Sequence, residues 1–384
     1  MLVRTRVGHR LHSRASECAL ALIGLVASLV DGCNSTNGGP GGSGGSSTGT
    51  GGDTAGTGGD MAGTGGGLAA GGRAGTGGTG ATDGGATTDA LQGVQEFPIT
   101  GSSAFPETIT LGPDGNLWFT DVGSHTIGKI TTAGAITQFS TPTPNSRPYG
   151  ITSGPDGNLW FTESASPNIG RITPEGTITE FPVPGGGAYG IAKGSDGNLW
   201  FVETGSNQIG CSTPTGTVTE FPITTAKSGS NYIAAGADGN LWFTEGSVGQ
   251  IGRITPTGTV TEFPLSDPAT ARPLGITAGP DGNIWFANQG GRRIGRITPA
   301  GTITEFPLSY TGANPGDITP GPDGNLWFVD YPSTVGRITL AGAIKEFPVV
   351  LTGSSHSLTS LVAGPDGNLW LADRNGHEIV RFTP

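Results

Sequence analysis

The sequence predicts an all-β fold, a seven-bladed β-propeller with four antiparallel strands per blade, over residues 94–384. Two observations support this prediction: one block of residues recurs seven times, and its period is close to constant. The block reads Asp-Gly-Asn-Leu-Trp-Phe in its first copy and contains every tryptophan of the chain: Trp118, Trp160, Trp200, Trp242, Trp285, Trp327 and Trp370. Successive tryptophans are 42, 40, 42, 43, 42 and 43 residues apart, and a period in the low forties is typical of propeller blades.

Each repeat divides into four short strands. In the second repeat we expect them at 149–152, 159–162, 169–172 and 177–181. Asp-Gly between two apolar runs predicts a tight hairpin, because glycine supplies the positive φ that the turn needs. The run Leu-Trp-Phe does not alternate with polar residues, which indicates a strand buried on both faces between neighbouring blades. Pro182 suits an outermost strand, whose N–H groups face water.

The two ends of the repeat region are expected to share a blade. The chain ends on the third strand of the seventh repeat, at 379–382, and the missing fourth strand stands before the first repeat, at 94–98. The N-terminal strand therefore completes the last blade, which removes an open sheet edge.

The segment before the propeller predicts export. Residues 1–32 resemble a lipoprotein-type signal peptide, with an arginine-rich start and an apolar run over 19–30 that is shorter than a spanning helix. Leu29 to Cys33 resembles a lipobox, so Cys33 is the expected lipidation site, and plain secretion is the alternative. Residues 33–93 are almost wholly Gly, Thr, Ser and Ala and are expected to form a disordered tether. We expect an exported, membrane-anchored bacterial lipoprotein, periplasmic or on the cell surface.

Charge and cysteine content narrow the possible partners. The formal net charge is −11, and no basic stripe of the kind that binds phosphates is present, so nucleic acid is not expected as a partner. An acidic surface favours cationic or neutral ligands, and the membrane is reached through the lipid anchor alone. Cys211 is the one cysteine of the propeller, so no disulfide framework is expected. We expect a monomer.

Most repeated residues have a scaffold explanation. The tryptophans are expected to pack between blades rather than to bind a ligand. Six of the seven third strands carry a basic residue at one position, such as Arg171, and Cys211 takes it in the third repeat. This basic residue is expected to pair with the acidic residue that ends the preceding strand. The residue three positions after each tryptophan is acidic in six of seven repeats, and its repetition favours pairing or capping over metal binding.

The candidate site lies where the repeat varies. The residues eleven positions before the first four tryptophans are Glu107, Tyr149, Tyr189 and Asn231, which are polar or aromatic, whereas the last three repeats have Leu, Gly and Thr there. These four side chains are candidates for binding a small molecule, a peptide or an envelope protein at the channel mouth. His356 stands three residues before the corresponding position of the last repeat. It is a candidate catalytic base, and Glu107 is a candidate metal ligand; a solvated loop histidine is the alternative.

The repeat also resembles a known family. The motifs Gly-Pro-Asp-Gly-Asn-Leu-Trp-Phe, Ile-Gly-Arg-Ile-Thr-Pro and Thr-Ile-Thr-Glu-Phe-Pro are similar to those of the virginiamycin B lyase (streptogramin lyase) propellers. The resemblance implies a carbon–oxygen lyase that linearises a cyclic depsipeptide by magnesium-assisted elimination. That family carries histidines in Pro-His-Gly-Ile motifs, but the matching positions here are Tyr149 and Leu274. We therefore expect a ligand- or protein-binding module, and a magnesium-dependent lyase acting on a streptogramin B or related ester is the alternative.

Overall fold

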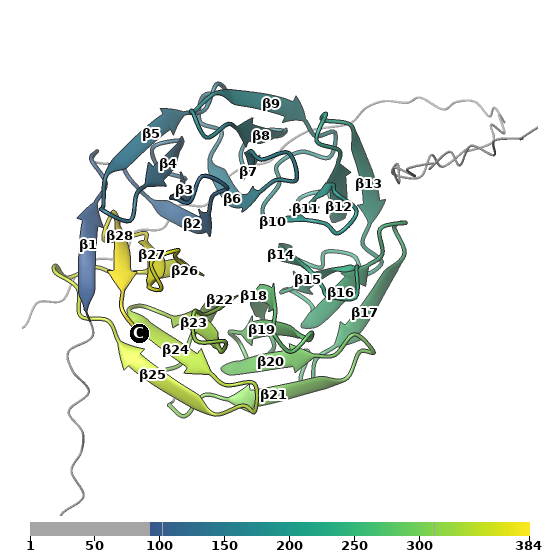
Figure 1. Cartoon of the computed structure of the whole chain (residues 1–384). Coiled ribbons are helices and arrows are strands. Elements are labelled where there is room, and N and C mark those ends of the chain that lie inside the picture. The colour runs from purple at the N-terminus through teal and green to yellow at the C-terminus, as the bar shows by residue number, and fades with distance from the viewer. Residues whose placement is uncertain (1–92, 102, 311) are drawn as a thin grey trace, which may run out of the picture. The chain divides into compact units, whose positions relative to one another are not determined.

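The computed structural model describes residues 93–384, except residues 102 and 311. It shows seven four-stranded antiparallel sheets arranged as blades around a central channel (Figure 1). This confirms the predicted all-β, seven-bladed propeller. The predicted signal peptide, Cys33 and nearly all of the tether lie outside the described residues. The part of the chain that the structure describes has no helix long and apolar enough to cross a membrane.

The strands fall into four concentric sets. The innermost strands, which line the channel, are β2 (Pro106–Leu111), β6 (Pro148–Ser153), β10 (Ile191–Lys193), β14 (Ser230–Ala235), β18 (Pro273–Ala278), β22 (Pro315–Pro320) and β26 (Leu358–Ala363). The second strands are β3 (Leu117–Asp121), β7 (Leu159–Glu163), β11 (Leu199–Glu203), β15 (Leu241–Glu245), β19 (Ile284–Asn288), β23 (Leu326–Asp330) and β27 (Leu369–Asp373).

The third strands are β4 (Thr126–Ile130), β8 (Asn168–Ile172), β12 (Gln208–Ser212), β16 (Gln250–Ile254), β20 (Arg293–Ile297), β24 (Thr334–Ile338) and β28 (Glu378–Phe382). The outermost strands are β5 (Ile136–Ser140), β9 (Ile178–Pro182), β13 (Val218–Pro222), β17 (Val260–Pro264), β21 (Ile303–Pro307), β25 (Ile344–Pro348) and β1 (Val94–Pro98). Each strand set therefore contains one strand from every blade.

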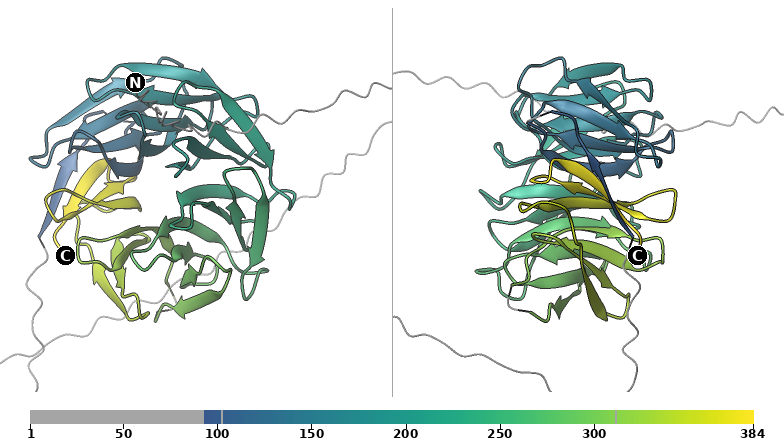
Figure 2. Two further views of the ribbon diagram at one scale, coloured as in Figure 1. Left: turned by 45° about the vertical axis from the view of Figure 1, so that its right-hand side comes forward. Right: turned by 90° about the vertical axis from the view of Figure 1, so that its left-hand side faces the viewer.

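The predicted closure of the ring is confirmed. β1 pairs with β28 from Val94 opposite Phe382 to Pro98 opposite Glu378. Figures 1 and 2 show the N-terminal strand beside the yellow C-terminal blade. The buried ring of Phe97 stacks on Trp370 with centroids 5.3 Å apart, so β1 contributes to the core of blade seven as well as to its sheet.

The recurring block builds the turn between the innermost and second strands. In blade two, Asp156 accepts hydrogen bonds from the side-chain amide of Asn158 (2.8 Å) and from the indole N–H of Trp160 (3.1 Å). Gly157 has a φ of 76°, a conformation that glycine adopts without strain. A Cβ on Gly154 would lie 2.4 Å from the indole ring. The block is therefore explained by turn and packing requirements.

The tryptophans pack between blades, as predicted. All seven are 0–1% exposed. Trp160 stacks on Phe181 of its own blade, with centroids 5.2 Å apart, and shares a buried cluster with Leu199 and Phe201 of blade three. Seven such clusters hold most of the buried apolar side chains, so the core consists mainly of the interfaces between blades.

The predicted pairing of the third-strand arginines is wrong. Arg171 Nη1 lies 3.8 Å from Oδ2 of Asp156 in the turn, not beside the acidic residue that ends the second strand. The antiparallel register places Arg171 opposite Trp160. Its guanidinium therefore lies over the rings of Trp160 and Phe181, at 5.8 and 5.4 Å from their centroids. The stacking on two aromatic faces directs this side chain toward the turn.

Candidate functional site

The channel opens on one face between the loops that enter the innermost strands. We use "channel mouth" for the side chains gathered there: Glu107, Tyr149, Tyr189, Tyr232, Asp317, Tyr331 and Arg374. They come from blades one, two, three, four, six and seven. Five of them lie near the start of an innermost strand, and Tyr331 and Arg374 directly follow a second strand. The Asp-Gly turns lie at the opposite ends of those strands.

Glu107 connects three blades at the mouth. It is 7% exposed, and its Oε2 lies 3.3 Å from Nη1 of Arg374 in blade seven. Burial raises the pKa of Glu107, whereas the Arg374 charge and the nearby Tyr149 hydroxyl of blade two act to lower it. The guanidinium already supplies a positive charge at this carboxylate. Glu107 is therefore placed for an ion pair, and its role as a metal ligand stays a prediction.

Four of the five tyrosines of the chain lie at the channel mouth. Tyr149 and Tyr189 meet edge to face, with ring centroids 4.9 Å apart, and Tyr149 and Tyr232 line one cavity. The ring of Tyr331 covers Gly316, since a Cβ on that glycine would lie 2.7 Å from it. Burial raises the pKa of Tyr149 and of Tyr232 above the usual range of phenols, so both hydroxyls remain protonated and can donate hydrogen bonds.

Asp317 is the second carboxylate of the mouth. It borders a cavity of about 130 Å³ that Tyr149 and Tyr232 also line. Its Oδ2 accepts a hydrogen bond from Ser360 Oγ (2.7 Å), and its Oδ1 accepts one from the backbone N–H of Ile318 (2.9 Å). Burial raises the pKa of Asp317 to about 6 against these hydrogen bonds, which lower it. A carboxylate with this pKa is largely ionised at neutral pH.

The structure brings three of the four predicted ligand-binding residues together, namely Glu107, Tyr149 and Tyr189. The side chain of Asn231, the fourth residue, forms hydrogen bonds with its neighbours instead. Its Nδ2 donates to Gly229 O at 3.3 Å, and its Oδ1 accepts from Thr204 Oγ1 at 3.3 Å.

Sequence reasoning missed Tyr232 and Asp317, which stand ten positions before their tryptophans, and Tyr331 and Arg374, which follow theirs by four. The small number of tyrosines is the signal that could have found Tyr232 and Tyr331. None of the four missed residues recurs at the same position in the other blades, so the scaffold does not require them.

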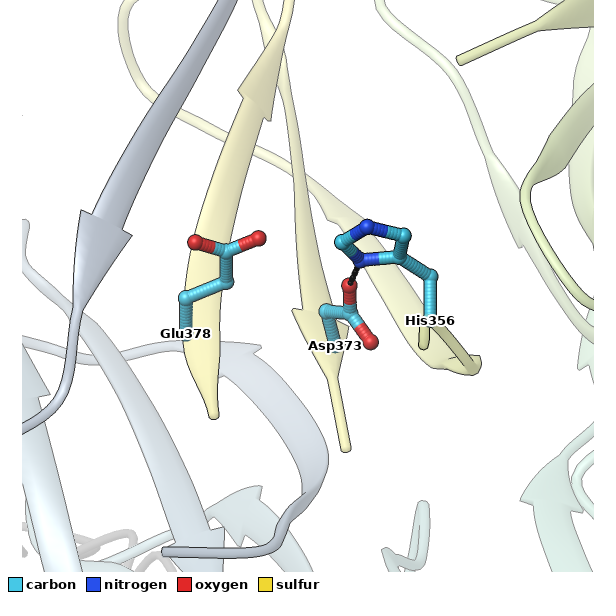
Figure 3. Close-up of side chains that lie close together, drawn as sticks. All are labelled: His356, Asp373 and Glu378. Carbon is cyan, nitrogen blue, oxygen red and sulfur yellow. Dashed lines mark hydrogen bonds and ion pairs between the residues drawn. The ribbon is translucent and has the colours of Figure 1, made fainter. Parts of the chain in front are cut away.

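His356 lies in the loop between β25 and β26, which enters the innermost strand of blade seven. Its Nδ1 donates a hydrogen bond to Oδ2 of Asp373 at 2.6 Å, and its Nε2 is buried without a hydrogen-bond partner among the described residues. Glu378 projects from the adjacent strand β28 (Figure 3). The predicted base is thus oriented by Asp373, whereas Glu107 has Arg374 as its ion-pair partner.

His356, Asp373 and Glu378 form a cluster with the donor atoms that a cation site needs. One ligand atom from each residue lies within 4.8 Å of the other two. Glu378 is 5% exposed, and its Oε1 has no hydrogen-bond partner in the described part of the chain. Burial, followed by the charges of Glu96 and Asp373, raises the pKa of Glu378 to about 7. The two carboxylates suit magnesium, which prefers oxygen ligands, whereas the histidine nitrogen suits zinc or another transition metal.

The ring of acidic residues that ends the second strands is buried, as its scaffold explanation requires. Asp121, Asp330 and Asp373 accept backbone N–H groups from the adjoining loops, at 2.6–2.8 Å. This confirms the predicted capping role for the aspartates. Cys211 is fully buried in β12, where a small apolar side chain packs well.

Comparison with known proteins finds virginiamycin B lyases both by family model and by structure. A model of the virginiamycin B lyase family matches residues 81–315 and 184–384. The crystal structure of virginiamycin B lyase from Staphylococcus aureus is 36% identical in sequence, with a TM-score of 0.71 over 76% of this chain and 99% of that chain. A catalytically inactive histidine-to-alanine variant of that enzyme, with quinupristin, matches at 35% identity with the same TM-score and coverage.

A streptogramin B lyase structure is 34% identical, again with a TM-score of 0.71, over 76% of this chain and 97% of that chain. A more distant match is the extracellular domain of a putative hybrid two-component system from B. thetaiotaomicron, at 14% identity and a TM-score of 0.58 over 75% of this chain and 41% of that chain. The distant match supports the fold alone. A search of curated proteins found no match.

Proposed function

This chain belongs to the virginiamycin B lyase family, and from that premise we propose that it is an exported protein, anchored through a lipid on Cys33, whose channel mouth binds a small molecule or a peptide. The observation that carries the proposal is the gathering of four of five tyrosines around two carboxylates. Concave sites with aromatic walls and a few converging polar groups are typical of ligand pockets.

The propeller fold does not require tyrosines or carboxylates at the channel mouth. Blade five has Leu274 and Gly275 at the positions where other blades carry mouth residues, and it forms the same four-stranded sheet. Tyrosine also offers a large, rigid contact surface with a polar end, a combination that suits binding sites. The mouth is therefore better explained by a ligand than by folding.

Binding can be tested with quinupristin, which is present in the structure of the S. aureus relative. We expect the full chain to bind it in isothermal titration calorimetry and Tyr149→Ala to weaken binding at least about tenfold, because a central aromatic anchor is lost. Tyr310→Ala is the matched control, since Tyr310 is the one tyrosine outside the mouth and its hydroxyl donates to Asp330. Equal affinity of Tyr149→Ala and the unmodified chain would contradict the proposal.

A second candidate function is a carbon–oxygen lyase, and the hydrogen bond between His356 and Asp373 favours it. A carboxylate that accepts a hydrogen bond from Nδ1–H keeps the proton on Nδ1 and leaves Nε2 free to accept a proton, which is the arrangement of a general base. Because Nε2 is buried, catalysis would require the loop between β25 and β26 to open, and ligand binding is for this reason the first proposal. Magnesium would be held by Asp373 and Glu378 and would polarise the ester carbonyl.

The lyase is tested by incubating the full chain with magnesium chloride and a type B streptogramin, followed by liquid chromatography and mass spectrometry. Elimination transfers a proton from carbon and breaks the ester C–O bond, so we expect a linear isomer of unchanged mass and altered retention. His356→Ala should abolish the new peak, and His125→Ala serves as the matched histidine control. Absence of the isomer, or a product heavier by one water, would exclude this candidate for that substrate.

A further inference from the structure

The side chains of the channel mouth indicate the chemical class of its ligand. We propose that the ligand presents a primary ammonium group, which enters the cavity beside Asp317. This inference rests on the proposed function and narrows it to amines, such as a lysine side chain or an alkyl diamine.

The cavity has a size and lining that suit the end of an alkylammonium chain. Its volume is about 130 Å³, and isoleucines of the innermost strands form much of its wall together with Tyr149 and Tyr232. A single water needs only about 10–15 Å³ on such a measure, so there is room for several heavy atoms. Asp317 is the one charged residue among the residues that line it. The cavity thus combines an apolar wall with one negative charge.

Asp317 has no cationic partner among the described residues. Its hydrogen-bond donors are neutral: Ser360 Oγ at 2.7 Å and the backbone N–H groups of Ile318 at 2.9 Å and Leu361 at 3.4 Å. A carboxylate has about four acceptor positions, which leaves one for a ligand. Glu107, by contrast, has a cationic partner, because Nη1 of Arg374 lies 3.3 Å from its Oε2. An ammonium group would supply the countercharge that Asp317 lacks.

The tyrosines add a second attraction for a cation. Tyr149, Tyr232 and Asp317 line the same cavity, so the two rings lie close to the carboxylate. Aromatic faces attract ammonium groups, and cages of aromatic residues recognise them in other proteins. An anion would be repelled by Asp317, and a neutral group would leave its charge uncompensated.

The scaffold does not explain Asp317. The corresponding residues of the other six blades, ten positions before each tryptophan, are Thr108, Gly150, Gly190, Tyr232, Gly275 and Ser360. None of them is a carboxylate, and the propeller closes in the same way around each. A partly buried charge that only one repeat carries is a candidate for binding, since its removal from water is unfavourable without a partner.

The test uses the full chain and 1,5-diaminopentane, measured by isothermal titration calorimetry beside the neutral isostere 1,5-pentanediol. We expect the diamine to bind and the diol not to bind, and we expect Asp317→Asn to weaken diamine binding at least about tenfold. Asp267→Asn, the same change in an exposed loop, is the matched control and should leave the affinity unchanged. Tyr232→Leu keeps the carboxylate but removes a ring and should weaken binding about threefold or more, which keeps the test decisive if Asp317→Asn does not fold.

The outcomes separate this inference from the proposed function. Equal binding of diamine and diol, or unchanged diamine affinity in Asp317→Asn, overturns the ammonium site, even if quinupristin still binds at the mouth. Binding of the diamine with the expected loss in Asp317→Asn supports the site, even if quinupristin does not bind. No binding of the diamine to the unmodified chain also overturns the inference.

Discussion

A chain that begins at Ile99 and therefore lacks β1 is expected to melt at least about 10 °C below a chain that begins at Gly93, or to aggregate. β1 pairs with β28 along its whole length, and Phe97 is 8% exposed in a cluster with Trp370 and Ile379. Removing it exposes this apolar surface and leaves β28 as an open edge. A loss of roughly 3–5 kcal/mol from the free energy of unfolding corresponds to a shift of that size.

Calorimetric melting and size-exclusion chromatography of the two chains give the measurement. Both lack residues 1–92, so the difference reports on the strand alone. A synthetic peptide of residues 93–98 added to the shorter chain should restore part of the lost stability, because it can occupy the vacant edge. Identical melting temperatures and a monomeric shorter chain would show that blade seven does not need its fourth strand.

The second large effect is a loss of stability as the pH rises from about 5 to 9. Burial, reinforced by the charge of an outer-strand glutamate, raises the pKa of Glu163 and Glu203 to about 7 and that of Glu245 to about 8. A carboxyl group whose pKa is higher in the folded state than the usual 4.5 contributes stability that is fully present at pH values below 4.5. Its contribution is lost as the pH rises through the folded pKa. We therefore expect the melting temperature to fall between pH 5 and 9.

Below about pH 5 the pH dependence of stability reverses, and stability is lost as the pH falls. Burial acts to raise the pKa of Asp114, but hydrogen bonds from Lys129 and Trp118 outweigh it and hold this pKa at about 2. Such a group stabilises the fold above its unfolded pKa, and its contribution is lost as the pH falls toward 2. The melting temperature is therefore expected to pass through a maximum near pH 5, and a value that is constant or rising from pH 5 to 9 would contradict this account.

Glu245→Gln should remove much of the loss at high pH, because neither oxygen of Glu245 has a hydrogen-bond partner among the described residues. Blade five shows what an amide does at this position, where Asn288 Nδ2 donates to Glu305 Oε1 at 2.9 Å. We expect a gain of roughly 2–4 kcal/mol at pH 9 relative to pH 5. Glu175→Gln, at an exposed turn, is the matched control.

The fold was predictable in detail because each repeat carries its own turn chemistry. The Asp-Gly turn, the buried Leu-Trp-Phe strand and the proline-ended outer strand are local features, and each is visible in sequence. The pairing of Arg171 was predicted wrongly, because the direction of a long side chain depends on its register partner and on the rings of Trp160 and Phe181. Those contacts exist only after the sheet has formed.

The candidate site was predictable in part. Glu107, Tyr149 and Tyr189 occupy an equivalent position in successive repeats, so their common location followed from the period. Tyr331 and Arg374 come from loops after the second strands, and no sequence pattern indicates that they turn toward the channel. Arg374 reaches Glu107 from the last blade, a contact between residues 267 positions apart that depends on ring closure.

The amino-acid sequence by itself determined the number of blades, the four strands in each and the closure of the ring, because these depend on local turns and short apolar strands that repeat about every 42 residues. Only the tertiary structure decided which polar groups meet. The propeller brings seven side chains from six blades to one channel mouth, where Asp317 lacks a countercharge and Glu107 has one. That difference arises from distances in space, which no sequence spacing encodes.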